Sequence, residues 1–291
     1  MDTLQAGLSG MLVGGLYALM AAGLSITWGV LRIINLIHFG LILLGAYLTF
    51  QIASSWDVDP ILTLAITAPA LFVLGAAVQW TFDRLAISEL SSLLLSFGLL
   101  IVLVQGISNL WSADFRQLTA VVNPYATRSV SVGGLGLVFP LPTLLAFVLA
   151  VALIGGAHVA LRRTFTGRAL RAFAQDRAIA AAFGIDHRRI GVLLAGAAGA
   201  TAAAAGMLFA MSNALTPATA FEWFGTVFAV VILGGIGHLL GTLVAGLLVG
   251  ALGAVVTVLI SAAAEPFVLF STIVLVLLLR PQGLFARGGT R

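Results

Sequence analysis

The sequence predicts an all-α, polytopic membrane protein, and three observations support this fold class. Of its 291 residues, 61% are hydrophobic and only 8% are charged, whereas soluble domains carry about 25% charged residues. The mean hydropathy is +1.15. Apolar runs such as LPTLLAFVLAVALIGGAHVAL are helix-length and lack the alternation of transmembrane barrel strands. We therefore expect a lipid bilayer to solvate most of the chain.

Helical spans are predicted where about 20 apolar residues run together, since that length crosses about 30 Å of hydrocarbon. Eight segments are assigned as full spans: 5–29, 34–54, 60–80, 90–110, 141–161, 190–211, 241–262 and 265–280. A ninth apolar piece, residues 223–236, is shorter and ends in Gly234-Gly235, which predicts a short or discontinuous helix. Together these segments predict a single transmembrane domain over residues 1–291, without a second soluble domain.

The positions of the arginines predict how the spans are oriented. Seven of the fourteen arginines lie within residues 162–189, between two apolar runs. If this segment is cytoplasmic and every apolar segment crosses once, twelve arginines lie inside and only Arg116 and Arg128 lie outside. This bias follows the positive-inside rule. We therefore expect an outside N-terminus, a cytoplasmic C-terminus and an external loop at residues 111–140.

The basic character of the chain is interpreted as a membrane signal. Arginines at the ends of spans orient a protein and contact anionic lipid, so membrane lipid is an expected partner and nucleic acid is not. The chain has no Lys and uses Ala, Gly, Leu and Val heavily, as proteins from GC-rich bacteria do. We expect a multi-pass protein of the bacterial inner membrane.

Several kinds of chemistry are missing from the sequence. A chain without Lys contains no Walker A motif, so it is not expected to hydrolyse ATP itself. It has no Cys, and its four His lie on separate segments, which argues against a metal site. Paired carboxylates for acid–base catalysis and charged groups in mid-span are also scarce. We expect neither enzymatic activity nor a cofactor bound by this chain, and any energy source must come from a partner.

The Arg-rich segment, residues 162–189, contains residues that favour short capped helices. Thr166 is expected to cap a first helix that ends near Gln175. Asp176 is expected to cap a second helix of two turns. Gly184 suits the left-handed position that follows such a helix.

The second short helix favours docking on another protein. Its residues combine a small face, at Ala178, Ala181 and Ala182, with two apolar side chains, Ile179 and Phe183. A segment that merely lies on anionic lipid would explain the arginines. It would not explain a capped helix with these side chains, so we prefer the docking interpretation.

Four stretches of the chain resemble one family of permeases. GRALRAFAQDRAIAAAFGID (167–186) resembles the cytoplasmic loop by which permeases of ABC importers dock on their ATPases. It is most similar to the LivH-type permeases of high-affinity branched-chain amino acid importers. Residues 15–47 resemble the first two spans of that family, residues 228–252 its Gly-rich late segment, and LLLRPQGLF (277–285) its C-terminal tail. The resemblance covers nearly the whole chain.

The resemblance implies a function and a set of partners. The chain would be the permease subunit of an ABC importer for branched-chain or other hydrophobic amino acids. Its partners would be a second related permease, two cytoplasmic ATPases that bind ATP and Mg, and a periplasmic substrate-binding protein. The residues expected to couple to the ATPases are Arg168, Arg171, Asp176, Arg177, Ala178, Ile179, Ala182, Phe183 and Gly184.

The chain departs from the family pattern at two points. Ala178 stands where the docking loop of the family has Glu, so a salt bridge from that position to the ATPase is absent. The usual His-Gly pair is replaced by His38-Phe39-Gly40.

Five residues are candidates for the translocation pathway. Asn35 and His38 are three apart, which predicts one helix face, and polar groups at that depth face the bundle interior or a water cavity. Bonding between helices without substrate contact is the alternative interpretation for this pair. The short segment 223–236 is a further candidate wall, with Glu222 at its start and Gly234 and Gly235 at its end.

Two other functions remain open from the sequence. Related ABC permeases carry urea or short amides, which would change the cargo but keep the machine. An autonomous secondary carrier or channel would be of a different class. Scarce charge within the spans argues against ion coupling, and the capped docking helix argues for a partner.

Overall fold

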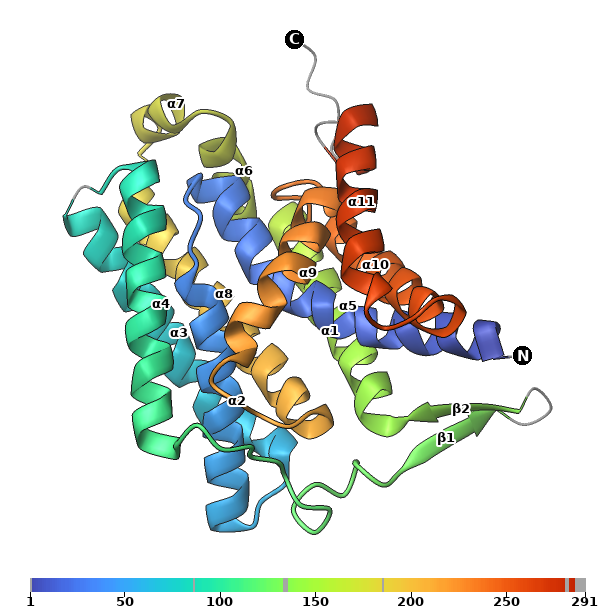
Figure 1. Cartoon of the computed structure of the whole chain (residues 1–291). Coiled ribbons are helices and arrows are strands. Elements are labelled where there is room, and N and C mark those ends of the chain that lie inside the picture. The colour runs from blue at the N-terminus through green and yellow to red at the C-terminus, as the bar shows by residue number, and fades with distance from the viewer. Residues whose placement is uncertain (1, 86, 133–135, 185, 281–282, 286–291) are drawn as a thin grey trace.

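The computed structural model describes the chain except for residues 1, 86, 133–135, 185, 281–282 and 286–291. It is almost entirely helical (Figure 1). The helices are α1 (Asp2–Leu31), α2 (Ile37–Trp56), the 3₁₀ turn η1 (Pro60–Thr63), α3 (Leu64–Arg84), α4 (Glu89–Trp111), α5 (Leu141–Arg163), α6 (Phe165–Gln175), α7 (Arg177–Ala182), α8 (His187–Ser212), α9 (Thr219–Gly234), α10 (Leu239–Leu259) and α11 (Ala264–Leu279). One hairpin, β1 (Ser129–Val132) and β2 (Leu137–Pro140), precedes α5. The all-α membrane fold is thus confirmed.

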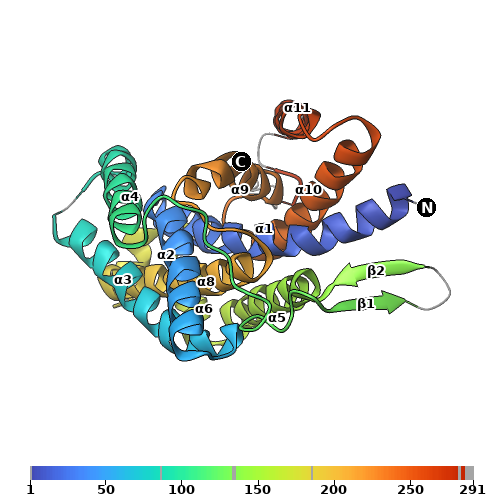
Figure 2. The ribbon, with the colours of Figure 1, turned by 60° about the horizontal axis from the view of Figure 1, so that its bottom comes forward.

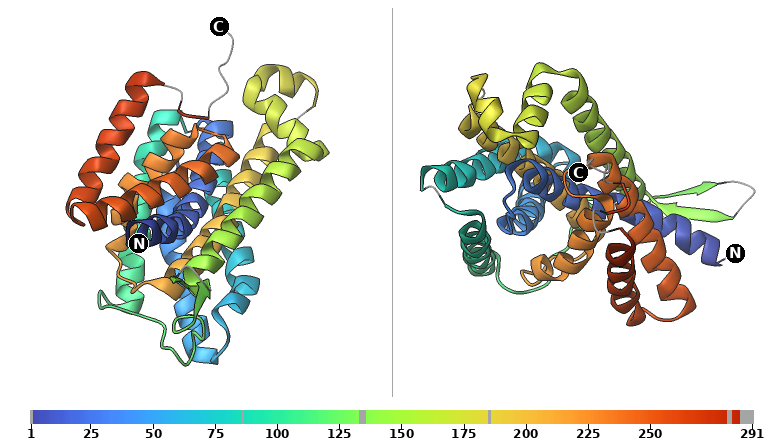
Figure 3. Two further views of the ribbon diagram at one scale, coloured as in Figure 1. Left: turned by 90° about the vertical axis from the view of Figure 1, so that its right-hand side faces the viewer. Right: turned by 90° about the horizontal axis from the view of Figure 1, so that it is seen from above.

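The expected count of eight full spans is wrong by one. Among the described residues, seven helices are long and apolar enough to cross a membrane, and α9 and α11 are shorter apolar helices. Each of these two has 16 residues, which corresponds to about 24 Å at 1.5 Å per residue. The segment 265–280 was predicted as a full span, but its helix α11 is shorter than the about 20 residues that match about 30 Å of hydrocarbon. α11 lies at the edge of the bundle (Figure 3).

Three helices form the centre of the bundle and three others surround them. In their most apolar stretches, 72% of the residues of α1 and of α8 are buried, against 17% for α5. α2 is buried to a similar extent as α1 and α8, whereas α3 and α4 are about as exposed as α5. The outer helices therefore present apolar faces to lipid, whereas α1, α2 and α8 contact mainly protein.

Small residues set the close packing of the central helices. α1 packs most extensively on α10, where Gly10 and Gly14 lie against the backbone of Gly250 and Gly246. A Cβ atom added to Gly14 would lie 2.8 Å from Leu247 Cα. The Gly-xxx-Gly patterns of the sequence thus serve contacts within the chain, because glycine lets two helix backbones approach this closely.

The loop at 111–140 folds against one end of the bundle. Arg116 pairs with Leu215 in an isolated antiparallel bridge, and the Asn123 Nδ2 donates to the Met211 carbonyl at 2.9 Å. β1 pairs with β2 in a hairpin that projects beside the N-terminal end of α1 (Figure 2). There the Gln5 Nε2 donates to the Val138 carbonyl at 2.6 Å.

The Arg-rich segment lies at the opposite end of the bundle from the 111–140 loop. α6, α7 and the C-terminal end of α11 gather at the top of Figure 1, and the loop that follows α4 lies at the bottom. Leu31, at the end of α1, packs with Phe173 of α6 and Ile190 of α8. This arrangement is the one that the alternating topology requires; which end faces the cytoplasm stays a prediction.

Candidate functional site

Only Thr164 separates the end of α5 from the start of α6, and it caps α6. The Thr164 Oγ1 accepts from the Gly167 N–H at 3.0 Å and donates to the Ala160 carbonyl at 2.7 Å. The sequence prediction of Thr166 as this cap is wrong, because Thr164 already has the extended backbone of a cap and Thr166 lies inside α6. Gly167 is buried directly against the backbone of Leu161, so the turn between α5 and α6 has no room for a side chain there.

The capping of α7 follows the sequence prediction. The Asp176 Oδ1 accepts from the Ile179 N–H at 3.0 Å. At the other end, Gly184 has a φ of +79° and its N–H donates to the Ala181 carbonyl at 2.9 Å. Asp186 caps α8 in the same way, by accepting from the Arg188 N–H at 2.9 Å. Ile185 lies outside the described residues.

One face of α7 is anchored, and the other presents apolar side chains to solvent. Ala180 is buried in a small cluster with Leu31, Phe173, Ile190 and Leu194. In contrast, Ile179 and Phe183 are 58% and 83% exposed. Two neighbouring apolar groups at a membrane surface, held by a capped helix, form a surface that a protein partner would cover.

The other predicted coupling residues are divided between two surroundings. Arg168, Asp176, Ala182 and Gly184 are exposed around α6 and α7. Arg171 lines a pocket between α6 and the ends of α1 and α5. The side chains of Arg177 and Ala178 lie outside the described residues.

Asn35 and His38 do not share a helix face as predicted. Residues 32–36 form a loop between α1 and α2, and α2 begins only at Ile37. Arg32 has a φ of +55°, and the backbone leaves the helical path there. Asn35 is therefore a buried loop residue whose Oδ1 has no hydrogen-bond partner among the described residues.

His38 joins two helices of the bundle. It is buried in the first turn of α2, and its Nε2 lies 3.0 Å from the Met20 carbonyl of α1. A Cβ atom on Gly23 would lie 2.9 Å from the same nitrogen. This geometry favours the interpretation of His38 as an interhelical hydrogen bond rather than as a substrate contact.

Glu222 lines a cavity near the 111–140 end of the bundle. The cavity has a volume of about 430 Å³ and lies between α1, α9 and the segment that joins α8 to α9. Its polar lining comes from Tyr17, Asn213, Thr216, Thr219, Glu222 and Thr226, and its apolar lining includes Val13, Leu16, Phe115, Phe209 and Trp223.

This cavity has an acidic character. Glu222 also lines an adjoining cavity of about 180 Å³ together with Glu265 of α11. Neither Arg nor His occurs among the described residues that line the two cavities. The sequence pointed to Glu222 alone, because Tyr17 and Trp223 read as ordinary apolar helix residues; only the acid in the first turn of α9 was a signal.

Gly234 and Gly235 lie in the turn between α9 and α10, away from the cavity lined by Glu222. Gly234 contacts the backbone of Gly241 and Thr242, and Gly235 has a φ of +84°. The C-terminal tail covers this turn, since the Leu284 N–H donates to the Leu233 carbonyl at 2.8 Å. Two of the sequence motifs, the Gly-rich segment and the tail, thus form one packed unit.

Comparisons with known proteins agree with this architecture. The family described as "Branched-chain amino acid transport system / permease component" matches residues 7–279. The chain is 27% identical over 295 residues to the high-affinity branched-chain amino acid transport system permease protein LivH of Escherichia coli K12, covering 98% of this chain and 96% of the relative. It is 28% identical over 299 residues to the corresponding protein BraD of Pseudomonas aeruginosa, with the same coverage.

A more distant relative extends the match beyond bacteria. It is a probable branched-chain amino acid transport permease protein LivH of Methanocaldococcus jannaschii, 26% identical over 264 residues, which cover 87% of this chain and 81% of the relative. No solved structure matches the chain significantly. Because the family match spans nearly every helix described above, the chain belongs to the family of branched-chain amino acid transport system permease components.

Proposed function

We propose that this chain forms the translocation pathway of an ABC importer for branched-chain or other hydrophobic amino acids. It is a multi-pass protein of the bacterial inner membrane, and its family makes it a permease subunit of an ABC importer rather than an enzyme. The names of its relatives support amino acids as the cargo. The proposed pathway includes the cavity lined by Glu222.

The chemistry of that cavity is the observation that carries the proposal. A hydrophobic amino acid has an ammonium group, a carboxylate and an aliphatic side chain, and the uncharged groups of Asn213, Thr216 and Thr219 are the donors that line the cavity for the carboxylate. The Glu222 carboxylate is placed to pair with the ammonium group, while Leu16 and Trp223 offer apolar surface to the side chain. Urea and short amides are neutral and small, so they gain little from a carboxylate with apolar walls. The cavity therefore favours amino acids over that alternative cargo.

The exposed face of α7 is the proposed contact with the ATPase subunits, which would bind ATP and Mg. Ile179 and Phe183 would enter a groove on an ATPase. Since Ala180 packs with Leu31 of α1 and Ile190 of α8, a displacement of α7 would move two central helices. Differential binding of α7 to the two ATPase states would then shift the bundle between outward-facing and inward-facing conformations. A second permease and a periplasmic binding protein would complete the importer.

Reconstitution tests the cargo. The chain would be purified with its partner permease and two ATPases, placed in liposomes and supplied with binding protein and labelled leucine. We expect leucine to stimulate ATP hydrolysis and to be taken up. Replacing Glu222 with Gln should raise the KM for leucine about tenfold, because a charged hydrogen bond is lost. Asp114→Asn, in the external loop, is the matched control.

A second pair of variants tests the coupling. Phe183→Asp should abolish leucine-stimulated ATP hydrolysis, whereas Phe165→Asp should retain it, although Phe165 is 78% exposed. Equal losses in both variants would argue against α7 as the contact. Uptake by this chain alone, driven by an ion gradient, would refute the importer assignment.

A further inference from the structure

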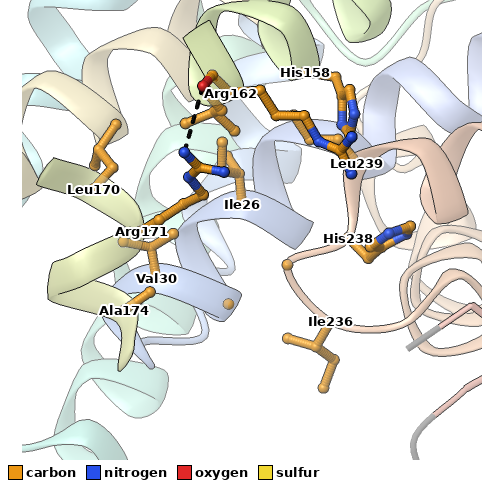
Figure 4. A pocket seen from close by; sticks show the side chains of 13 residues that line it. Ile26, Val30, His158, Arg162, Leu170, Arg171, Ala174, Ile236, His238 and Leu239 are labelled. Atoms are coloured by element: carbon orange, nitrogen blue, oxygen red, sulfur yellow. Dashed lines mark hydrogen bonds between the residues drawn. The ribbon is translucent and has the colours of Figure 1, made fainter. Parts of the chain in front are cut away.

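A basic pocket lies at the α6–α7 end of the bundle, where α1, α5, α6 and the α9–α10 turn meet. Its volume is about 270 Å³. Four basic side chains line it: His158 and Arg162 from α5, Arg171 from α6 and His238 from the turn (Figure 4). Three of them lie on the consecutive helices α5 and α6, and His238, which is distant in the sequence, joins them only in the folded chain.

The pocket has no acidic counterpart within the described chain. Neither Asp nor Glu is among the residues that line it. The salt bridge between Arg189 and Asp186 lies outside this pocket. The Arg171 Nη2 donates to the Arg162 backbone carbonyl at 3.4 Å, which places the Arg171 side chain against the end of α5, while the Arg162 side chain extends toward His158 (Figure 4). Two guanidinium groups without a carboxylate in reach form a site for an anion with several oxygen atoms, such as a phosphate.

One wall of the pocket depends on two glycines. The α9–α10 turn approaches α1 so closely that a Cβ atom on Gly29 would lie 2.7 Å from the Gly237 nitrogen. Gly237 also has a φ of +79°, and its N–H donates to the Ser25 Oγ at 3.2 Å. The turn is thus fixed to α1, and His238 is held at the rim.

An apolar crevice adjoins the basic pocket. It has a volume of about 70 Å³ and lies between α1, α5 and α8, where its lining includes Gly23, Ala157 and Ala198. Ile26 and Leu239 line both the crevice and the basic pocket, so the two lie next to each other. Leu153, on the far side of the crevice, is 39% exposed on the outer helix α5. The crevice thus has a partly exposed residue of an outer helix in its lining.

We propose that this pocket and crevice bind an anionic phospholipid. Arg162 and Arg171 hold the phosphate of the headgroup, and the start of an acyl chain enters the crevice between α1, α5 and α8. A basic headgroup site that continues into an apolar slot matches an amphiphile better than it matches a soluble anion or an acidic protein surface. Basic pockets between membrane helices bind such headgroups in other proteins. The bound lipid would join α5 and α6 to α1, next to the segment that leads into α7.

Native mass spectrometry of the purified full-chain complex tests the proposal. The complex would be titrated with phosphatidylglycerol, phosphatidylcholine or inorganic phosphate. We expect retained phosphatidylglycerol and a preference over phosphatidylcholine. The double variant Arg162→Gln/Arg171→Gln should weaken phosphatidylglycerol binding about 30-fold, from about fivefold per arginine.

The chain offers a closely matched control. Arg163 and Arg168 lie on the same two helices and are exposed, as Arg162 and Arg171 are, but they do not line the pocket. The variant Arg163→Gln/Arg168→Gln has the same charge change and should bind phosphatidylglycerol within about twofold of the unmodified chain. Should the first double variant not assemble, each of its single variants is measured, with a loss of about fivefold expected.

Four results would overturn the proposal. Equal losses in the two double variants would mean that only the overall surface charge matters. If the unmodified complex bound phosphatidylglycerol no better than phosphatidylcholine, the pocket would not be a site for anionic lipid. Competition by millimolar inorganic phosphate at full strength would assign the pocket to a soluble anion. If the variant Arg162→Gln/Arg171→Gln lost the ATPase subunits but bound lipid unchanged, the pocket would be a protein contact. None of these results depends on the amino acid cargo.

Discussion

Replacing Gly14 by alanine tests the packing of α1 on α10. The added Cβ atom would lie 2.8 Å from Leu247 Cα, about 0.6 Å short of the 3.4 Å at which ordinary contact begins. The opposing atoms belong to the backbone, so rotation of a side chain does not relieve the overlap. The two helices must separate, and such overpacking costs about 1–3 kcal/mol.

A matched substitution isolates this contact from helix propensity. Gly98 lies inside α4, and a Cβ atom added there has no neighbour within 4 Å among the described atoms. Both glycines are interior helix positions, so alanine stabilises each by about 1 kcal/mol through propensity alone. The difference in unfolding free energy between Gly14→Ala and Gly98→Ala therefore reports the contact, and we expect about 1–3 kcal/mol.

Thermal unfolding in one detergent, followed by the fluorescence of the five Trp residues, provides the measurement. Gly14→Ala should unfold several degrees below the unmodified chain, and Gly98→Ala at or slightly above it. If Gly14→Ala unfolded at the same temperature as Gly98→Ala, the close α1–α10 packing described here would be refuted.

Three further predictions concern a buried histidine, a cap and a tyrosine. His38→Ala should lower the unfolding free energy by about 2–4 kcal/mol, through a cavity and a lost hydrogen bond, while leucine uptake per folded complex stays unchanged; a selective loss of uptake would instead make His38 a pathway residue. Asp176→Ala should remove the α7 cap at a cost of about 1 kcal/mol, seen as faster amide exchange in α7, with Asp114→Ala as a control that leaves this exchange unaltered. The pKa of Tyr125 is raised above 10.0, and the main cause is the hydrogen bond from its hydroxyl to Asp59. The folded state thus favours neutral tyrosine, and stability that is present below pH 10 is lost as the pH rises through the higher folded pKa. The chain has three tyrosines, so the difference in phenolate absorbance between the unmodified chain and Tyr125→Phe isolates Tyr125. This difference should titrate late, and a difference that titrates at the ordinary pH would contradict the bond.

Local features of this protein could be predicted from its sequence. Long apolar runs gave the helices, and Asp176 and Gly184 marked the ends of α7, because capping depends on residues within one turn of each other. The break between the first two helices was predicted between residues 29 and 34, but α2 begins only at Ile37, because the apolar Ile34 and Leu36 gave no sign that the loop extends that far. The cap of α6 was displaced from Thr166 to Thr164 because both threonines fit the local pattern and only the end of α5 selects between them.

The candidate sites depended on tertiary structure. The cavity at Glu222 combines Tyr17, Thr216 and Trp223 from separate segments, and the basic pocket combines α5, α6 and the turn at His238. In a bilayer, residues that face lipid and residues that face other helices are equally apolar. Hydropathy therefore determined which segments are membrane helices. Only the packing of those helices decided which faces meet and where cavities remain between them.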